Sequence, residues 1–234
     1  GGGMVKSRVW LAAGAVSAQA GLPFVSLAQA RAPAGAPAQN DCNDGLAHPI
    51  PYEPPQGAGK ERGLVLGGGG AYLASWMVGY FTALKSKGVD VAQADIAVGT
   101  SAGSVVGAAL MGGRLWRLRS ELDILGEFPK LFALLIPTMA PNPSQVRARH
   151  IANTASQASP EVIQSIGRAA MAARNPAGPS DYFTTVRRLI GEEKWPSPKL
   201  HTTAIDCYTG QRVIVSQAAN IRINEACAAS SSLP

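Results

Sequence analysis

The feature that most constrains the fold is a Gly-x-Ser-x-Gly turn between two apolar segments. Residues 95–98 (Asp-Ile-Ala-Val) are typical of a buried strand, residues 99–103 read Gly-Thr-Ser-Ala-Gly, and residues 104–110 are typical of a buried helix. A strand that becomes a helix within so few residues forces its middle residue into a strained backbone conformation, and the flanking glycines let neighbouring chain approach closely. The pattern predicts a Ser101 hydroxyl lifted off the sheet at a helix N-terminus, where a serine nucleophile is favoured.

A simpler interpretation of the same turn is structural. Short Gly/Ser patterns occur by chance, and Ser101 would also serve as the N-cap of an ordinary strand-to-helix connection. The apolar β-branched run before the turn and the Ala/Val/Leu helix after it favour the catalytic interpretation.

A run of four glycines precedes the serine turn by one helix and one strand. Residues 63–66 predict a short strand, residues 67–70 are all glycine, and residues 71–85 predict a helix that ends near Gly88. Strand–helix–strand–helix order is typical of a parallel α/β sheet whose functional loops follow the strand C-termini. The two loops should therefore meet at one edge of the sheet.

Converging loops of this kind suit acyl transfer. A carbonyl under attack becomes an oxyanion, which backbone N–H groups stabilise if they point at it. Gly68, Gly69 and Gly70 offer such groups with no side chain to block approach. The sequence therefore predicts Ser101 as nucleophile and these three glycines as the oxyanion hole.

Four blocks in order carry a family resemblance. They are residues 66–70 (Leu-Gly-Gly-Gly-Gly), 99–103, the hairpin 204–210 (Ala-Ile-Asp-Cys-Tyr-Thr-Gly) and 229–234 (Ala-Ser-Ser-Ser-Leu-Pro). With them the chain resembles the patatin-like phospholipase family over residues 63–234. The resemblance implies a three-layer α/β/α fold with a mainly parallel central sheet, incomplete at the C-terminus. It also implies hydrolysis of lipid or phospholipid esters by a Ser–Asp dyad.

The chain departs from the family pattern in two places. The family usually carries Arg or Lys and then Gly after its glycine run, whereas Tyr72 and Leu73 stand here, so the register of the oxyanion glycines is open. The family's aspartate lies in an Asp-Gly-Gly or Asp-Gly-Ala turn beyond the Ala-Ser-x-x-x-Pro block, whereas this chain ends at Pro234 and its Asp44-Gly45 pair falls in the leader. We therefore expect that the catalytic aspartate is not present in this chain. We expect little turnover from these residues alone and activity from a full-length parent.

Two other functions remain open. One is an α/β-hydrolase esterase with a triad of Ser101, Asp181 and His201, in the chain order of that class. The other is a lipid-binding module that keeps the fold without the chemistry.

Composition and motifs argue against several partners. The lysine of a Walker loop is absent, and Leu73 occupies the third glycine position of the dinucleotide fingerprint, so no nucleotide is expected. Aromatic residues make up 6% of the chain and the basic residues are scattered, so no nucleic acid is expected despite a net charge of +6. An anionic lipid surface is compatible with that charge. Cys42, Cys207 and Cys227 have no metal-ligand spacing, so no metal or other cofactor is expected, and the last two should be inert core thiols.

The chain is expected to have three parts. Residues 1–30 have a basic start, an uncharged middle and an Ala-Gln-Ala end, which is typical of a signal peptide or a disordered leader. Residues 31–60 are a Pro/Ala/Gly-rich linker, and residues 61–234 form the hydrolase domain. Export or membrane association is favoured, with a cytoplasmic location as the alternative.

Within the hydrolase domain, some segments predict regular helices and strands and others do not. Residues 115–143 show a less regular pattern than the segments before them, and the apolar run 128–137 fits either a buried core helix or a flap that contacts lipid. Helices are predicted from Pro160 to about residue 175 and from about residue 180 to Gly191. Strands are predicted at 200–206 and 212–216, joined by a hairpin turn.

Overall fold

The computed structural model describes residue 57 and residues 59–127, 142–173 and 178–232. The predicted leader, most of the linker and the apolar run 128–137 lie outside these described residues. In chain order the elements are β1 (Gly63–Leu66), α1 (Gly70–Ser86), β2 (Ile96–Gly99), α2 (Ala102–Met111), α3 (Leu115–Glu127), α5 (Pro143–Thr154), α6 (Pro160–Ala172), α7 (Gly178–Ile190), β3 (Leu200–Ile205), β4 (Arg212–Val215) and α8 (Ile223–Ser231).

The sheet is mainly parallel, as predicted. Its strands lie in the order β1-β2-β3-β4, with β1, β2 and β3 parallel and β4 antiparallel to β3. In the register, Leu66 pairs with Gly99 and Gly99 pairs with Thr202. The C-terminal ends of β1 and β2 are therefore neighbours, and the glycine run and the serine turn leave the sheet side by side.

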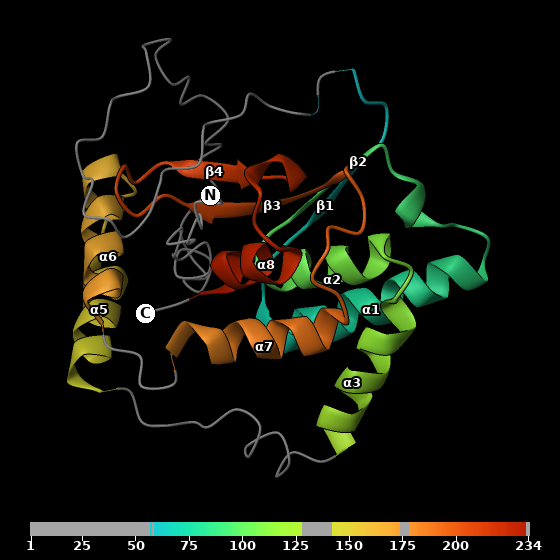
Figure 1. Ribbon diagram of the computed structural model, residues 1–234, viewed down its shortest axis with the longest axis horizontal. Coiled ribbons are helices and arrows are strands. Elements are labelled where there is room, and N and C mark those ends of the chain that lie inside the picture. The colour runs from blue at the N-terminus through green and yellow to red at the C-terminus, as the bar shows by residue number, and fades with distance from the viewer. Residues whose placement is uncertain (1–56, 58, 128–141, 174–177, 233–234) are drawn as a thin grey trace, which may run out of the picture.

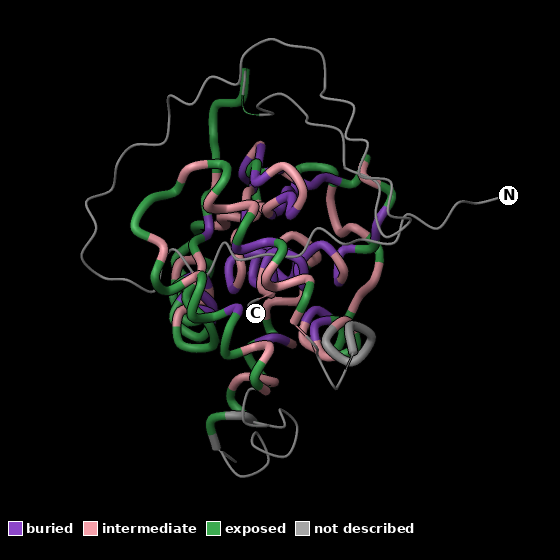
Figure 2. The backbone as a smooth tube through the Cα atoms, turned by 90° about the vertical axis from the view of Figure 1, so that its left-hand side faces the viewer, coloured by how far each residue is buried: buried purple, intermediate pink, exposed green. Residues whose placement is uncertain are grey.

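Helix α2 forms the centre of the core. Its residues from Ala102 to Leu110 are all buried, and it packs against β1, β2 and β3 (Figure 1). Figure 2 shows that the buried segments gather in the middle of the molecule. A Cβ at Gly107 would lie 3.1 Å from the side chains of both Leu66 and Leu200, so glycine at this position lets the helix approach the sheet closely. Helices α1, α3, α7 and α8 pack around α2.

The described helices of this core cover one side of the sheet (Figure 1). Residues of α2 and α8 share one buried cluster with Leu66 and Leu200, which face that side. On β1, Val65 points the other way and is 81% exposed. The α/β class is thus confirmed, and the described residues contain the sheet with one helical layer; the second layer expected from the resemblance stays a prediction.

The predicted hairpin and the helix that follows Ser159 are confirmed. The Asp206 carboxylate accepts hydrogen bonds from the N–H groups of Tyr208 (2.8 Å) and Thr209 (3.2 Å), which fixes the turn between β3 and β4. Gln164 on α6 donates to the Tyr208 carbonyl at 2.7 Å, so the helix packs on the hairpin.

Helix α5 was not predicted, although its N-terminus carries a strong signal. The Asn142 side chain accepts from the Ser144 and Gln145 N–H groups, Gln145 bonds back to the Asn142 N–H, and Pro143 stands at the first helical position. This short helix is largely polar, so its sequence shows little of the apolar periodicity by which a helix is recognised.

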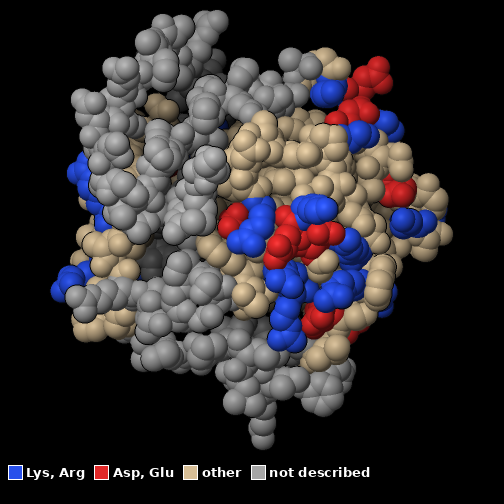
Figure 3. Space-filling model, in the orientation of Figure 1, with Lys and Arg blue, Asp and Glu red and all other residues tan. Residues whose placement is uncertain are grey.

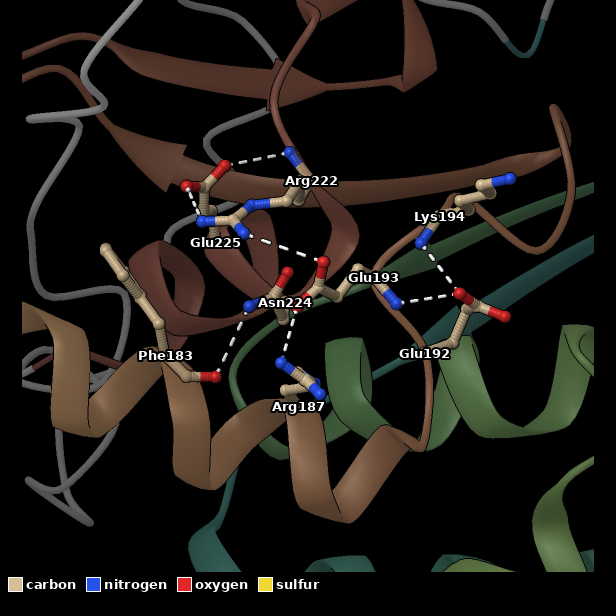
Figure 4. Close-up of polar contacts among 8 residues, drawn as sticks. All are labelled: Phe183, Arg187, Glu192, Glu193, Lys194, Arg222, Asn224 and Glu225. Carbon is tan, nitrogen blue, oxygen red and sulfur yellow. Dashed lines mark hydrogen bonds and ion pairs between the residues drawn. The ribbon is translucent and has the colours of Figure 1, made fainter.

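A chain of ion pairs fastens α8 to α7 and to the segment between α7 and β3 (Figure 4). Arg187 pairs with Glu193 at 2.9 Å, Glu193 with Arg222 at 3.6 Å, and Arg222 with Glu225 at 2.8 Å. Figure 3 shows that basic and acidic side chains lie next to one another on this face of the molecule. The Glu193 carbonyl also accepts from the Ile223 N–H at 3.0 Å, so the start of α8 is fixed by backbone as well as by charge.

Among the described residues no helix combines the length and the apolar character needed to cross a membrane.

Candidate active site

Ser101 occupies a strained turn between β2 and α2. Its backbone has φ 53° and ψ −120°, outside the regions that a residue with a side chain normally adopts. Such a conformation costs about 1–3 kcal/mol and persists only where the surroundings enforce it. The predicted elbow is therefore present, and Ser101 is not an ordinary N-cap, because its side chain makes no capping hydrogen bond.

The two flanking glycines are required by close packing. A Cβ at Gly99 would lie 2.5 Å from the Gly103 carbonyl oxygen, and a Cβ at Gly103 would overlap the Leu66 carbonyl oxygen at the end of β1. Any side chain at either position would push the elbow away from the sheet.

Neighbouring hydroxyls hold the backbone of the elbow. The Ser101 N–H donates to Ser230 Oγ on α8 at 2.9 Å, and Ser104 Oγ donates to the Ser101 carbonyl at 2.6 Å. Both partners are at most 1% exposed. The strained residue is thus tied on both sides by buried groups from two different helices.

The residue before the nucleophile is also fixed. The Thr100 N–H donates to the Leu66 carbonyl at 3.0 Å, and its hydroxyl lies 2.7 Å from the Thr203 hydroxyl on β3. The elbow is therefore bonded to both neighbouring strands.

The glycine loop lies directly beside Ser101. A Cβ at Gly68 would be 3.2 Å from Ser101 Cβ and 3.8 Å from Ser101 Oγ. Gly69 and Gly70 follow with φ 152° and φ 62°, and Gly70 begins α1 without a capping side chain. The sequence predicted that the two loops would meet, and they do; which amides bind an oxyanion stays a prediction.

The start of α1 is suited to negative charge. The first N–H groups of a helix have no partner within it, and the helix dipole is positive at this end. Gly69 and Gly70 are both exposed. An oxygen bonded to a carbon near Ser101 Oγ would therefore meet a favourable field.

Where the base of Ser101 lies stays a prediction. No described side chain makes a hydrogen bond with Ser101 Oγ. His201 is buried within β3, and its Nδ1–H donates to the Lys199 carbonyl at 3.0 Å, where a triad would place a carboxylate. The Asp181 side chain lies outside the described part, so the triad stays a prediction that the described contacts do not support.

The two described cysteines behave as predicted. Cys207 and Cys227 are fully buried. Burial raises the pKa of the Cys227 thiol to about 12, against a smaller opposing effect of its hydrogen bond with Ser104. The prediction that both thiols lie in the core is thus confirmed, and their inertness stays a prediction.

Ser230 is the site residue that sequence reasoning missed. The block Ala-Ser-Ser-Ser-Leu-Pro marked its segment as part of the resemblance, but nothing in the pattern says that its hydroxyl accepts from the Ser101 N–H.

Comparison with known proteins supplies three findings. The family model described as patatin-like phospholipase matches residues 64–234. Among solved structures, the chain is similar to the type III effector protein ExoU, with 19% identity and a TM-score of 0.37, over 74% of this chain and 40% of that chain. The chain thus spans less than half the length of ExoU. A search of curated proteins found no match.

Proposed function

The chain belongs to the patatin-like phospholipase family, and on this premise we propose that it is a serine acyl hydrolase of lipid or phospholipid esters. Ser101 is the nucleophile, and the backbone N–H groups of Gly68, Gly69 and Gly70 form the oxyanion hole. The base is the aspartate of a Ser–Asp dyad, as the family resemblance implies. The enzyme meets its substrate at a membrane or micelle surface.

The observation that carries this proposal is the strained Ser101 with Gly68 at its side chain. A hydroxyl on such an elbow is presented to a carbonyl carbon, and the glycine loop approaches the carbonyl oxygen from beside it. Ser101 Oγ bonds to that carbon while its proton passes to the base, and the negative charge develops on the carbonyl oxygen. The alcohol leaves with a proton, and water then releases the acid from the acyl-enzyme.

The glycine loop supplies the electrostatic part of this reaction. In a comparable hydrolase, removing one oxyanion donor lowers the catalytic rate by about a hundredfold to a thousandfold. Amides at the start of α1 need no reorganisation when the charge appears, since Gly69 and Gly70 have no side chains and α1 fixes the loop. The loop is therefore expected to contribute to the rate by stabilising the charge that develops in the transition state.

We also propose that residues 1–234 alone turn over slowly. Ser101 Oγ has no hydrogen-bonding base among the described residues, and a serine hydroxyl of ordinary acidity is a weak nucleophile. The same observation favours a second candidate, a lipid-binding module that retains the fold. Tyr72 and Leu73, which stand where the family usually has Arg or Lys and then Gly, favour that candidate too.

A fluorophosphonate probe distinguishes the two candidates. The probe reacts with an activated serine and stays attached. Labelled protein therefore accumulates over time even if the reaction is slow. After prolonged incubation and peptide mapping, we expect modification at Ser101 in the wild-type protein and none at that peptide in Ser101→Ala. His201→Gln should leave the labelling rate unchanged. Absence of label at Ser101 would favour the binding module, and loss of label in His201→Gln would favour the triad.

A further inference from the structure

The exposed face of α1 carries three aromatic side chains in one stripe. Tyr72, Trp76 and Tyr80 are 81%, 57% and 48% exposed, and their spacing of four residues places them on one side of the helix. The Trp76 and Tyr80 rings stack, with centroids 5.1 Å apart and planes 9° apart. The opposite side of α1 is buried through Ala74, Met77, Val78 and Phe81. The stripe is thus apolar surface that the described fold leaves uncovered.

This face also lacks the charges of an ordinary solvated helix. Residues 63–84 contain no charged side chain. The other exposed positions of α1 up to residue 83 are small: Gly70, Ala71, Ser75, Gly79 and Ala83. A surface helix normally places charged residues on its outer face. Here small residues surround the rings, so a flat partner can reach them without displacing charges.

The first charged side chains after the stripe are both cations. Lys85 lies in the last turn, where it pairs with Asp90 at 3.5 Å, and Lys87 follows exposed at the helix end. No acidic residue lies within α1. The pattern of an uncharged aromatic face followed by lysine is complementary to a bilayer that contains anionic lipid.

The stripe is continuous with the proposed oxyanion loop. Tyr72 is two residues beyond Gly70, the first residue of α1. A surface that receives the stripe would therefore lie next to Gly69 and Gly70, at the opening to Ser101 Oγ. Trp and Tyr rings are the side chains that favour the boundary between acyl chains and headgroups.

From this arrangement we propose that the exposed face of α1, through Tyr72, Trp76 and Tyr80, docks the protein on an anionic phospholipid bilayer with its active-site opening toward the lipid. The inference rests on the proposed function, because it assigns the surface by which that site meets its substrate. Helix α1 lies in the plane of the interface, with its rings at headgroup depth and the exposed Lys87 at its C-terminal end near the phosphates.

The binding test uses Ser101→Ala protein, so that hydrolysis cannot alter the vesicles. Sedimentation with vesicles of phosphatidylcholine mixed with phosphatidylserine measures partitioning. Adding Trp76→Ser and Tyr80→Ser should weaken binding by about tenfold or more, because two rings no longer leave water. The control adds Val146→Ser and Ile151→Ser on α5, which lies at the opposite end of the molecule (Figure 1) and is also exposed. The control should bind like the Ser101→Ala parent.

A second measurement places the helix directly. Brominated phosphatidylcholine in the same vesicles should quench tryptophan fluorescence of the Ser101→Ala protein, and Trp76→Phe should remove most of that quenching while vesicle binding persists. Unaltered quenching in Trp76→Phe would overturn the proposal, as would equal vesicle binding by the ring variant and its parent. So would gel filtration in which the ring variant converts a dimer to a monomer while neither protein binds vesicles, because the face would then join two copies.

These outcomes are separable from those of the proposed function. Vesicle binding that depends on the rings, together with no fluorophosphonate label at Ser101, would support the proposed docking surface and contradict the proposed hydrolase activity. Label at Ser101, together with vesicle binding that does not depend on the rings, would support the hydrolase activity and contradict the docking surface.

Discussion

The backbone N–H of Ser101 donates a 2.9 Å hydrogen bond to the Ser230 hydroxyl, 129 positions further along the chain. This bond joins the strained elbow to α8, which is itself fastened to α7 by the Arg187–Glu193–Arg222 ion pairs. Hydrogen bonds of this kind are how a fold enforces a backbone conformation that the isolated residue would not keep. Ser230 is thus a positioning residue for the proposed nucleophile.

Replacing Ser230 with alanine tests that role. The Ser101 N–H would lose its acceptor at a site where Ser230 is 1% exposed, which should lower the free energy of unfolding by about 1–3 kcal/mol. The elbow should also relax, so the rate of fluorophosphonate labelling at Ser101 should fall more than stability alone explains. Ser232→Ala is the matched control, because the Ser232 hydroxyl donates only to the Ala228 carbonyl within the chain's last described turn. Equal labelling rates in the two variants would show that Ser230 does not position Ser101.

Much of the fold could be predicted from the sequence because its signals are local. The Gly-x-Ser-x-Gly turn between an apolar strand and an apolar helix fixed β2 and α2, and the glycine run after residues 63–66 fixed β1 and α1. Once β1 and β2 are neighbours, the meeting of their loops follows from topology alone.

The contacts that complete the site could not be predicted in this way. The bond from Ser101 to Ser230 depends on how α8 packs on α2, which no local pattern encodes. The register of the glycine run was open because Tyr72 and Leu73 stand where the family usually has Arg or Lys and then Gly. Only the backbone path shows that Gly68 lies beside Ser101 and that Gly69 and Gly70 adopt positive φ.

Two adjacent glycines of the loop provide a sharp comparison. A Cβ at Gly68 would lie 3.2 Å from Ser101 Cβ, whereas a Cβ at Gly67 would have no heavy atom within 4 Å. We expect Gly68→Ala to slow fluorophosphonate labelling at Ser101 by about tenfold or more, since the methyl group crowds the nucleophile and shifts an oxyanion donor. Gly67→Ala should label at close to the wild-type rate. The assignment of this loop to the oxyanion hole fails if the two variants label alike.

The packing of the elbow on β1 predicts a large loss of stability in Gly103→Ala. The added Cβ would overlap the Leu66 carbonyl oxygen, so α2 or β1 must move, at a cost of about 1–3 kcal/mol in the free energy of unfolding. Gly79→Ala on α1 is the control, because its Cβ would meet nothing within 4 Å and alanine is the better helix former by about 1 kcal/mol. Urea denaturation should therefore move the two midpoints in opposite directions. A midpoint for Gly103→Ala close to that of wild type would contradict the packing described for the elbow.

The last prediction concerns acid stability and Glu192. The N–H groups of Lys194 and Glu193 and the Arg114 guanidinium, at 2.8 Å, lower the pKa of this carboxyl to about 2 from an ordinary value of 4.5. Because the folded-state pKa is the lower one, the group stabilises the fold fully above about pH 4.5, and this contribution is lost as the pH falls toward 2. Glu192→Gln keeps an oxygen acceptor but cannot ionise, so it should be less stable than wild type at neutral pH. Its urea midpoint should also fall less steeply between about pH 5 and pH 2, the span over which the wild-type carboxyl loses its stabilising contribution. Parallel pH profiles for the two proteins would mean that the hydrogen bonds around Glu192 do not lower the pKa of its carboxyl in the folded state.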